Sequence, residues 1–144
     1  MSWQARLALG YRRESTRTLA SDRHEGPLRV LKALYPEGPG ICHHVLVHPP
    51  GGIAGGDRLD IDIMLEADAH ALLTTPGATR FYRSAGAHAH QSVRIGLQRG
   101  ARLEWLPMAT IAYDGCLAQN RVHFTLDDDA AIVGADIVAL GLPA

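Results

Sequence analysis

The sequence predicts an all-β protein: a layered, solenoid-like stack of β-hairpins in a single domain at residues 1–144. Two kinds of observation predict this class. Apolar and polar residues alternate in several segments, which is typical of strands with one buried face. Turn-forming residues separate these segments at intervals of roughly 8–15 residues, which is the spacing of all-β proteins.

The clearest strand is expected at residues 58–65, where Leu59, Ile61 and Ile63 occupy one face and Asp60 and Asp62 the other. A strand is also expected at residues 41–48. Residues 26–34 are the best helix candidate, but their leucines, valine and flanking prolines suit a strand equally well. The same alternation recurs at residues 4–12, 92–98 and 121–126. Turn signals lie at residues 36–40, 49–52, 55–57, 76–77, 99–100, 114–115 and 127–129.

An internal repeat supports the stacking. The pattern Leu-x3-Ala-x-(Ala/Leu/Ile) begins at Leu65, Leu97 and Leu126, so its leucines are 32 and then 29 residues apart. A second pattern, Pro-x-Ala-Thr-x2-Tyr, begins at Pro76 and again at Pro107. Stacked units of this kind bury faces that no single unit could bury alone. The alternative is that an alanine-rich composition produces these echoes by chance.

Charge and cysteine content exclude several classes of partner. The formal charge is −1, from 14 basic and 15 acidic residues, and no basic cluster is present, so nucleic acid is not an expected partner. No apolar run approaches the length that spans a membrane, and the N-terminus lacks the apolar core of a signal peptide. Cys42 and Cys116 lie far apart without a CxxC motif. A reducing, cytoplasmic location is therefore expected.

The glycine-rich run from Gly51 to Gly56 does not match a nucleotide loop. A Walker loop requires Gly-Lys-Ser/Thr, and a dinucleotide loop requires GxGxxG between a strand and a helix. A tight turn between the strands at residues 41–48 and 58–65 is expected instead. The sequence also lacks GxSxG and any Cys/His/Asn order that indicates nucleophilic catalysis.

Eight histidines raise the question of a metal site. His44 and His48 would share one face of a strand but lie roughly 13 Å apart, at ~3.3 Å per residue, too far to hold one ion. His88 and His90 are better placed, roughly 6.6 Å apart, yet the glutamate that follows in cupin metal motifs is missing. No tight single-ion site is expected, and scattered structural histidines remain the alternative.

Two carboxylates interrupt apolar strands. Glu104 lies in Leu-Glu-Trp-Leu, and Asp136 lies in Gly-Ala-Asp-Ile-Val. A buried carboxylate must be paired, hydrogen-bonded or close to a cation. Either these side chains line a hydrated internal passage, or they point outward from strands with one wet face.

Several segments together resemble the UreD (UreH) family of urease accessory proteins. Two long blocks carry the resemblance, HPPGGIAGGDRL at residues 48–59 and TTPGATRFYRS at residues 74–84. The match extends from about Trp3 to Ala144. Shorter supporting segments are RHEGPLRV at 23–30, YPEG at 35–38, LEWLP at 103–107 and LGLPA at 140–144.

The resemblance implies a β-rich, two-layered, non-enzymatic chaperone of metalloenzyme maturation. Such a protein binds the accessory proteins F and G, G being a GTPase, and docks them on apo-urease. Nickel is thought to pass through an internal polar tunnel, so nickel is expected in transit and no cofactor is expected to be tightly bound. By motif, Asp57 and Asp136 match acidic positions associated with that tunnel, and Glu104 is added by its position alone.

This sequence departs from the family pattern at Met108 and Ala109, where polar residues are usual, at Ala135, which replaces a tryptophan, and at Arg80, which replaces a lysine. Family chains are also longer, so the stack is expected to be incomplete relative to the family. Three alternatives therefore stay open: a plain β-stack interaction module, a non-functional fragment, or a β-fold metalloenzyme that uses the histidines.

Overall fold

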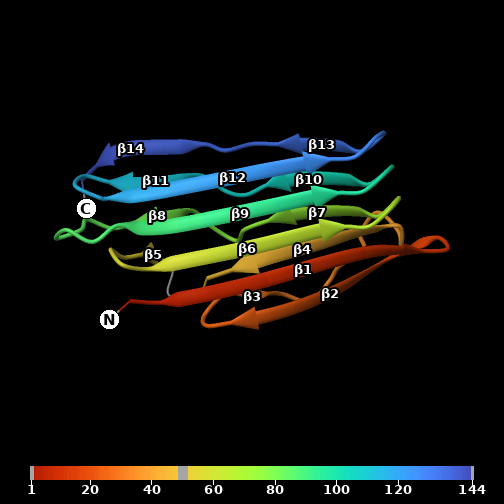
Figure 1. Ribbon diagram of the computed structural model, residues 1–144, viewed down its shortest axis with the longest axis horizontal. Coiled ribbons are helices and arrows are strands. Elements are labelled where there is room, and N and C mark those ends of the chain that lie inside the picture. The colour runs from red at the N-terminus through yellow and green to blue at the C-terminus, as the bar shows by residue number, and fades with distance from the viewer. Residues whose placement is uncertain (1, 49–51, 144) are drawn as a thin grey trace.

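A computed structural model describes residues 2–48 and 52–143, and these residues form fourteen strands and no helix. The all-β, solenoid-like class is confirmed, and no described residue belongs to a helix that could span a membrane. The strands form three sheets (Figure 1). The first contains β12 (Ala118–Leu126), β9 (Ala89–Leu97), β6 (Arg58–Leu65), β1 (Gln4–Glu14) and β2 (Arg17–Glu25). The second contains β13 (Ala131–Gly134), β10 (Arg102–Leu106), β7 (His70–Thr74), β4 (Ile41–Val47) and β3 (Arg29–Val30), and the third contains β14 (Val138–Leu142), β11 (Thr110–Tyr113), β8 (Thr79–Phe81) and β5 (Gly52–Ile53).

The chain visits the three sheets in order and then rises to the next layer. Strands β6, β7 and β8 form one turn, β9 to β11 the next and β12 to β14 the third, above a first layer of β1, β4 and β5. Strands of successive turns pair in parallel. The two strands of a unit therefore hydrogen-bond to the layers above and below them, and not to each other as in a closed hairpin.

The repeat that begins at each leucine is a structural unit. After each long strand one residue adopts a left-handed conformation: Asp68 (φ 63°), Gly100 (φ 73°) and Asp129 (φ 59°). Aspartate and glycine tolerate this region better than most residues. The next residue is alanine, and Ala69 and Ala101 are fully buried. This turn carries the chain from the first sheet into the second.

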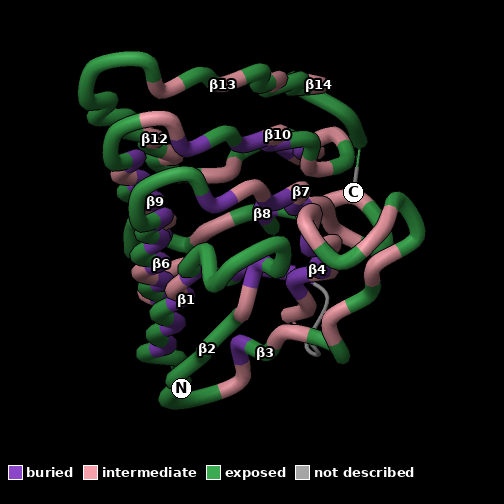
Figure 2. The backbone as a smooth tube through the Cα atoms, turned by 90° about the vertical axis from the view of Figure 1, so that its right-hand side faces the viewer, coloured by how far each residue is buried: buried purple, intermediate pink, exposed green. Residues whose placement is uncertain are grey.

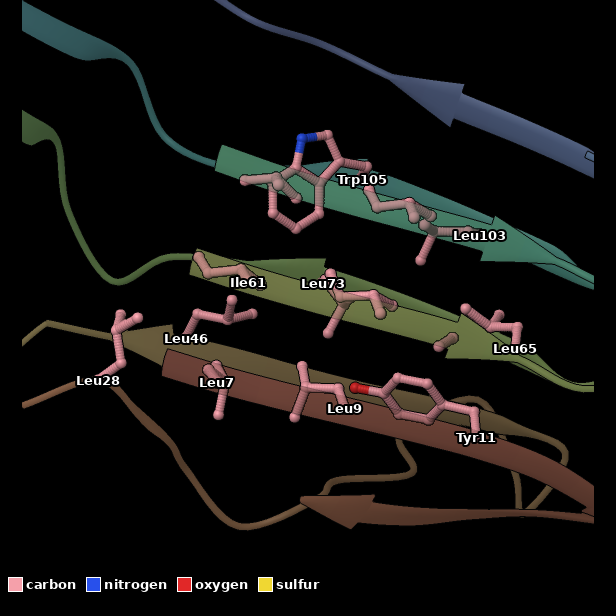
Figure 3. Close-up of a cluster of buried hydrophobic side chains, with 14 of the residues drawn as sticks. Leu7, Leu9, Tyr11, Leu28, Leu46, Ile61, Leu65, Leu73, Leu103 and Trp105 are labelled. Carbon is pink, nitrogen blue, oxygen red and sulfur yellow. The ribbon is translucent and has the colours of Figure 1, made fainter. Parts of the chain in front are cut away.

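The core consists of ladders of inward-facing side chains, each running through successive layers (Figure 3). Leu9, Ile63 and Ile95 occupy equivalent positions of β1, β6 and β9, and all three are buried. The period-two pattern of the sequence produces this arrangement, because every second residue of a strand points to the same face. Parallel ladders contain Leu7, Ile61 and Val93, and Tyr11, Leu65 and Leu97.

Most residues of the last layer are exposed, including two of the inward residues of β12 (Figure 2). Phe124 continues the Ile95 ladder but retains 38 % of its accessible surface, and Leu126 retains 41 %. Strands β13 and β14 are also exposed: Leu140 retains 78 % of its surface, and Val133, on the outward face beside Glu104, retains 65 %. The stack therefore ends in an apolar layer with unpaired strand edges.

Two segments differ in detail from the sequence expectation. Residues 26–34 form no helix; they contain the short strand β3, which pairs antiparallel with β4. The glycine-rich run is more than a turn, because Gly52 and Ile53 form β5 and pair with β8. Gly51 of this run lies outside the described residues, as do Pro49 and Pro50 of the turn expected at residues 49–52.

Candidate functional site

An axial cavity of about 250 Å³ lies inside the stack. Its wall contains residues from every layer: Ile53 of the first, Ile61 of the second, Val93 and Trp105 of the third, and Val122 of the last. The cavity therefore follows the axis along which the turns are stacked. Its remaining lining comes from Leu28, Leu46, Val47, His48, Leu59, residues 75–80, Gln91, Pro107, Met108, Thr110, Asn120 and Asp136.

One wall of the axial cavity carries stacked amides. Leu59, Gln91 and Asn120 occupy the same inward position in β6, β9 and β12. The Gln91 Nε2 donates a hydrogen bond of 3.2 Å to Asn120 Oδ1. The ladder thus changes from apolar to polar as it approaches the exposed end, and it presents amide groups to the interior.

His48 contributes a polar group without a protein partner. Its Nε2 is buried, and no atom of the described residues hydrogen-bonds to it. Burial lowers the pKa of His48, and the nearby Asp57 carboxylate opposes that shift. The imidazole is therefore neutral at pH 7, beside a negative charge and in the wall of a cavity. His48, Arg80 and Asp136 are the titratable side chains among the described lining residues, and Arg80 is exposed.

Asp57 is buried, with 1 % of its surface accessible, and both of its carboxylate oxygens accept backbone hydrogen bonds. The Trp3 amide donates to Oδ1 at 2.7 Å, and the Ala54 amide donates to Oδ2 at 2.9 Å. Asp57 thereby joins the start of β1 to the turn between β5 and β6. It is not among the residues that line the axial cavity.

Asp136 lies in the connection between β13 and β14, exposed, and lines the axial cavity where it approaches the last layer. It also lines a second, smaller hollow of about 240 Å³ with Trp105 and Phe124. A carboxylate here places negative charge at the exposed end of the cavity.

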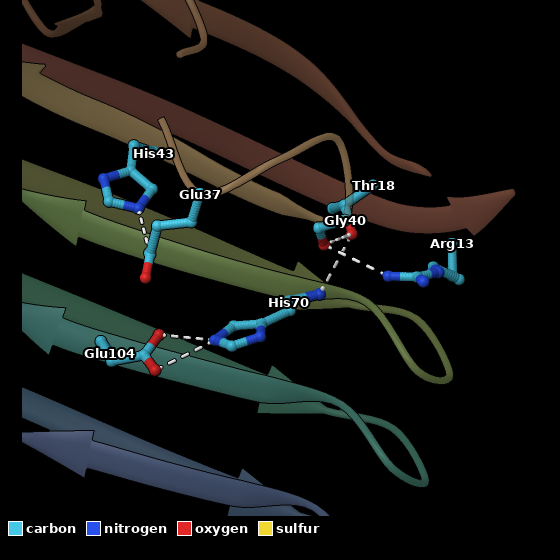
Figure 4. Close-up of polar contacts among 7 residues, drawn as sticks. All are labelled: Arg13, Thr18, Glu37, Gly40, His43, His70 and Glu104. Carbon is cyan, nitrogen blue, oxygen red and sulfur yellow. Dashed lines mark hydrogen bonds and ion pairs between the residues drawn. The ribbon is translucent and has the colours of Figure 1, made fainter. Parts of the chain in front are cut away.

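Glu104 points away from the cavity, on the outer face of the second sheet (Figure 4). Its two oxygens lie 3.0 and 2.9 Å from His70 Nε2 on the neighbouring strand β7. His43 on β4 makes a similar contact of 2.7 Å with Glu37. Glu104 is thus one half of a partly exposed surface pair.

The structure does not bring the three predicted carboxylates together. Asp57 is buried in a turn, Asp136 lies at the exposed end of the cavity, and Glu104 faces outward. Among residues 2–48 and 52–143, no three His, Cys, Asp or Glu side chains converge as a metal site would require. The rings of His88 and His90 are close, with centroids 6.4 Å apart.

The sequence analysis missed the functional candidates His48, Gln91 and Asn120. His48 was considered only as a second ligand beside His44. His44 is buried, and its Nδ1 lies 2.6 Å from the Tyr11 hydroxyl. Gln91 and Asn120 could have been found, because the strand alternation places each at an inward, normally apolar position.

The comparison with known proteins places this architecture in a family. The family model described as UreD urease accessory protein matches residues 4–144. The chain belongs to the UreD family. A urease accessory protein UreD from Leptothrix cholodnii is 61 % identical over 146 residues, covering 100 % of this chain and 52 % of its own length. The UreD proteins of Polaromonas naphthalenivorans and Variovorax paradoxus are 57 % and 58 % identical, and each is matched over 52 % of its length.

This UreD-family chain spans about half the length of the curated relatives that it matches. The family is one of accessory proteins rather than of enzymes. Two departures from the family pattern lie in the cavity wall, where Arg80 and Met108 are among the lining residues.

Proposed function

We propose that this chain is part of a cytoplasmic, non-enzymatic scaffold that helps to deliver nickel to apo-urease in complex with the accessory proteins F and G. Nickel is its cargo and not a resident cofactor. The observation that carries the proposal is the axial cavity, which crosses every layer of a protein from a urease accessory family.

The size of the axial cavity suits a hydrated ion. A single water molecule requires ~10–15 Å³ of such space, and the cavity offers about 250 Å³. Its polar groups come from the Gln91 and Asn120 amides, from threonines at 75, 79 and 110, and from His48. A divalent ion could exchange protein contacts for water at several points along the axis.

The charges favour passage of a cation over its storage. Asp136 supplies negative charge at the exposed end, and the buried Asp57 supplies it beside His48. Arg80 opposes a cation, but it is exposed to solvent, which weakens its field. Because no three ligands converge among the described residues, an ion would be held weakly and would exchange quickly. We therefore assign Asp136 and the Asp57 charge to the passage, whereas Glu104, on the outer face, lies outside it.

The test is co-production of the chain with the F and G proteins and the urease subunits, followed by affinity purification through the chain. The proposal predicts that these partners are recovered together and that the recovered urease contains nickel. If the partners are recovered together but the recovered urease contains no nickel, a plain interaction module would be favoured instead. Recovery of no partner would contradict the proposal for this chain.

A further inference from the structure

The two ends of the stack differ in how their strand edges are protected. At the first end, β2 covers β1 in an antiparallel pair, and its exposed residues are mostly charged or polar. Charged side chains on an edge strand discourage pairing with a further chain. At the other end, β12, β13 and β14 each stand last in their sheet, and most of their residues are exposed (Figure 2). This last layer therefore offers free backbone groups together with apolar side chains.

We propose that a second copy of this chain covers the last layer, in a two-fold dimer that joins two stacks end to end. Strand β12 pairs with β12 of the second copy, and β13 pairs with β14 of the second copy, all in antiparallel fashion. A two-fold axis perpendicular to both the strands and the stacking direction produces these pairs, because it reverses the strand direction and exchanges β13 with β14. The inference does not depend on the proposed passage of nickel.

The layout of the last layer is compatible with such an axis. Strands β13 and β14 lie end to end on one side of the stack, and β12 spans the other side (Figure 1). Val122 is the middle residue of β12, and Asp136 is the middle residue of the connection between β13 and β14. Val122 and Asp136 line the same two hollows of the stack. One axis can therefore pass close to both residues.

Around an axis at Val122, inward residues of β12 meet inward residues of the second copy. Phe124 lies opposite Asn120, two residues from the axis on either side. Val122 continues the row of the buried Val93, and every second residue of a strand points to the same face. The pairing therefore extends the core rows into the second copy. It would cover Phe124 and Leu126, which retain 38 % and 41 % of their surface in the single chain.

The opposite wall follows the same rule. Around an axis at Asp136, Ile132 lies opposite Leu140 of the second copy. Ile132 continues the row of Leu103, and Leu140 continues the row of Ala112; both rows are buried in the layer below. Residues directly opposite each other in an antiparallel pair point to the same face, so Ile132 and Leu140 can pack together inside the joined stack. Leu140, which is 78 % exposed in the single chain, gains most from this contact.

The expected product is a dimer and not a longer series. A two-fold contact uses the same surface on both copies, so no last layer remains free after two chains have joined. The far end of each copy carries the charged strand β2. The two Asp136 carboxylates approach each other at the axis, and like charges opposite each other oppose association. The apolar rows must outweigh this repulsion.

The first test is sedimentation equilibrium of the 144-residue chain over a range of concentrations. We expect a monomer–dimer equilibrium, and we expect Leu140→Lys to weaken the dimer roughly tenfold or more, because it buries an unpaired charge in the joined core. The matched control Val133→Lys adds the same charge at an outward position of the same layer and should leave the equilibrium unchanged. A monomer at every concentration, an open series of oligomers, or equal effects of the two variants would overturn the proposal.

Disulfide cross-linking tests the register directly. Val122→Cys places two thiols at the axis, where opposite Cα atoms of antiparallel strands are about 4.5–5.5 Å apart, within reach of a disulfide. In the matched control Phe124→Cys, the two thiols belong to positions roughly 13 Å apart. Both variants are made in a Cys116→Ser background, because Cys42 is fully buried and Cys116 is not.

With diamide as the oxidant, which takes up the two thiol hydrogens as the disulfide forms, Val122→Cys should give a covalent dimer and Phe124→Cys should not. A mixture of Phe124→Cys with Asn120→Cys should cross-link again. No covalent dimer from Val122→Cys, or an equal yield from Phe124→Cys alone, would contradict the proposed axis.

An accessory protein could cover the last layer in place of a second copy. The chain alone would then sediment as a monomer, and Leu140→Lys would abolish recovery of that protein, which would overturn the dimer. Because the sedimentation and cross-linking experiments contain neither partners nor nickel, failure of the dimer can be distinguished from failure of the proposed accessory role.

Discussion

Replacing Asp57 with alanine tests whether this residue is primarily a structural link. The substitution removes the carboxylate that accepts hydrogen bonds of 2.7 and 2.9 Å from the Trp3 and Ala54 amides. A hydrogen bond to a charged group contributes about 1.5–3 kcal/mol. Trp3 is partly exposed, so its amide can turn to water and the lower value applies to each bond. The expected loss is about 3 kcal/mol, which corresponds to a fall in Tm of about 6–12 °C for a chain of this size.

Thermal and urea unfolding followed by circular dichroism would measure this loss. Asp57→Asn should fall between the parent and Asp57→Ala, because the amide keeps one acceptor oxygen and loses the other. The matched control is Asp62→Ala, which removes an exposed carboxylate paired with Arg94 at 2.8 Å and should change Tm little. If Asp57→Ala cost no more than the control, the structural role assigned to Asp57 would be refuted.

Three further predictions concern stability and association. Gly52→Ala should lower the free energy of unfolding by about 1–2 kcal/mol, because the added Cβ would lie 2.1 Å from the Tyr82 ring; Tyr82→Ala should remove most of that cost in a double-mutant cycle. The pKa values of His44 and His48 are lowered from 6.5 by burial, so only the unfolded histidines take up protons as the pH falls below about 6.5. Urea titrations should therefore show stability unchanged by these groups above that pH and falling below it, by up to ~1.4 kcal/mol per pH unit for each histidine, whereas a flat profile would contradict the assignment. The exposed last layer should make the chain self-associate, and Leu140→Lys should reduce this; a monodisperse monomer of the parent at high concentration in light scattering would refute it.

The strand pattern and the repeat were predictable from the sequence because both arise from local rules. Alternation at residues 58–65 reports one buried face, and the left-handed positions at Asp68 and Asp129 follow the leucines at the repeat spacing. The short strand at Gly52–Ile53 was not predictable, since its partner β8 is distant in sequence and two residues carry almost no periodicity.

The candidate site was predictable only in part. Asp136 was expected to line an internal passage, and it lies among the residues that line the axial cavity. Glu104 was expected in the same passage only because its neighbours in the sequence are apolar. Glu104 occupies an outward position of β10 between two inward residues, Leu103 and Trp105. The alternation of inward and outward residues along a strand could have indicated that Glu104 faces outward. His48 could not be found from spacing, because its importance depends on the cavity and on the missing hydrogen bond.

The measurement that tests the account most directly is the nickel content of urease matured with Asp136→Ala and, in parallel, with Glu104→Ala. Both variants remove one carboxylate, but only Asp136 lines the axial cavity. With the F and G proteins and the urease subunits co-produced, the yield of complex should be the same for both. We predict that Asp136→Ala lowers the nickel bound per urease and that Glu104→Ala does not. Equal nickel content in the two preparations, at equal complex yield, would contradict an internal nickel passage along this cavity.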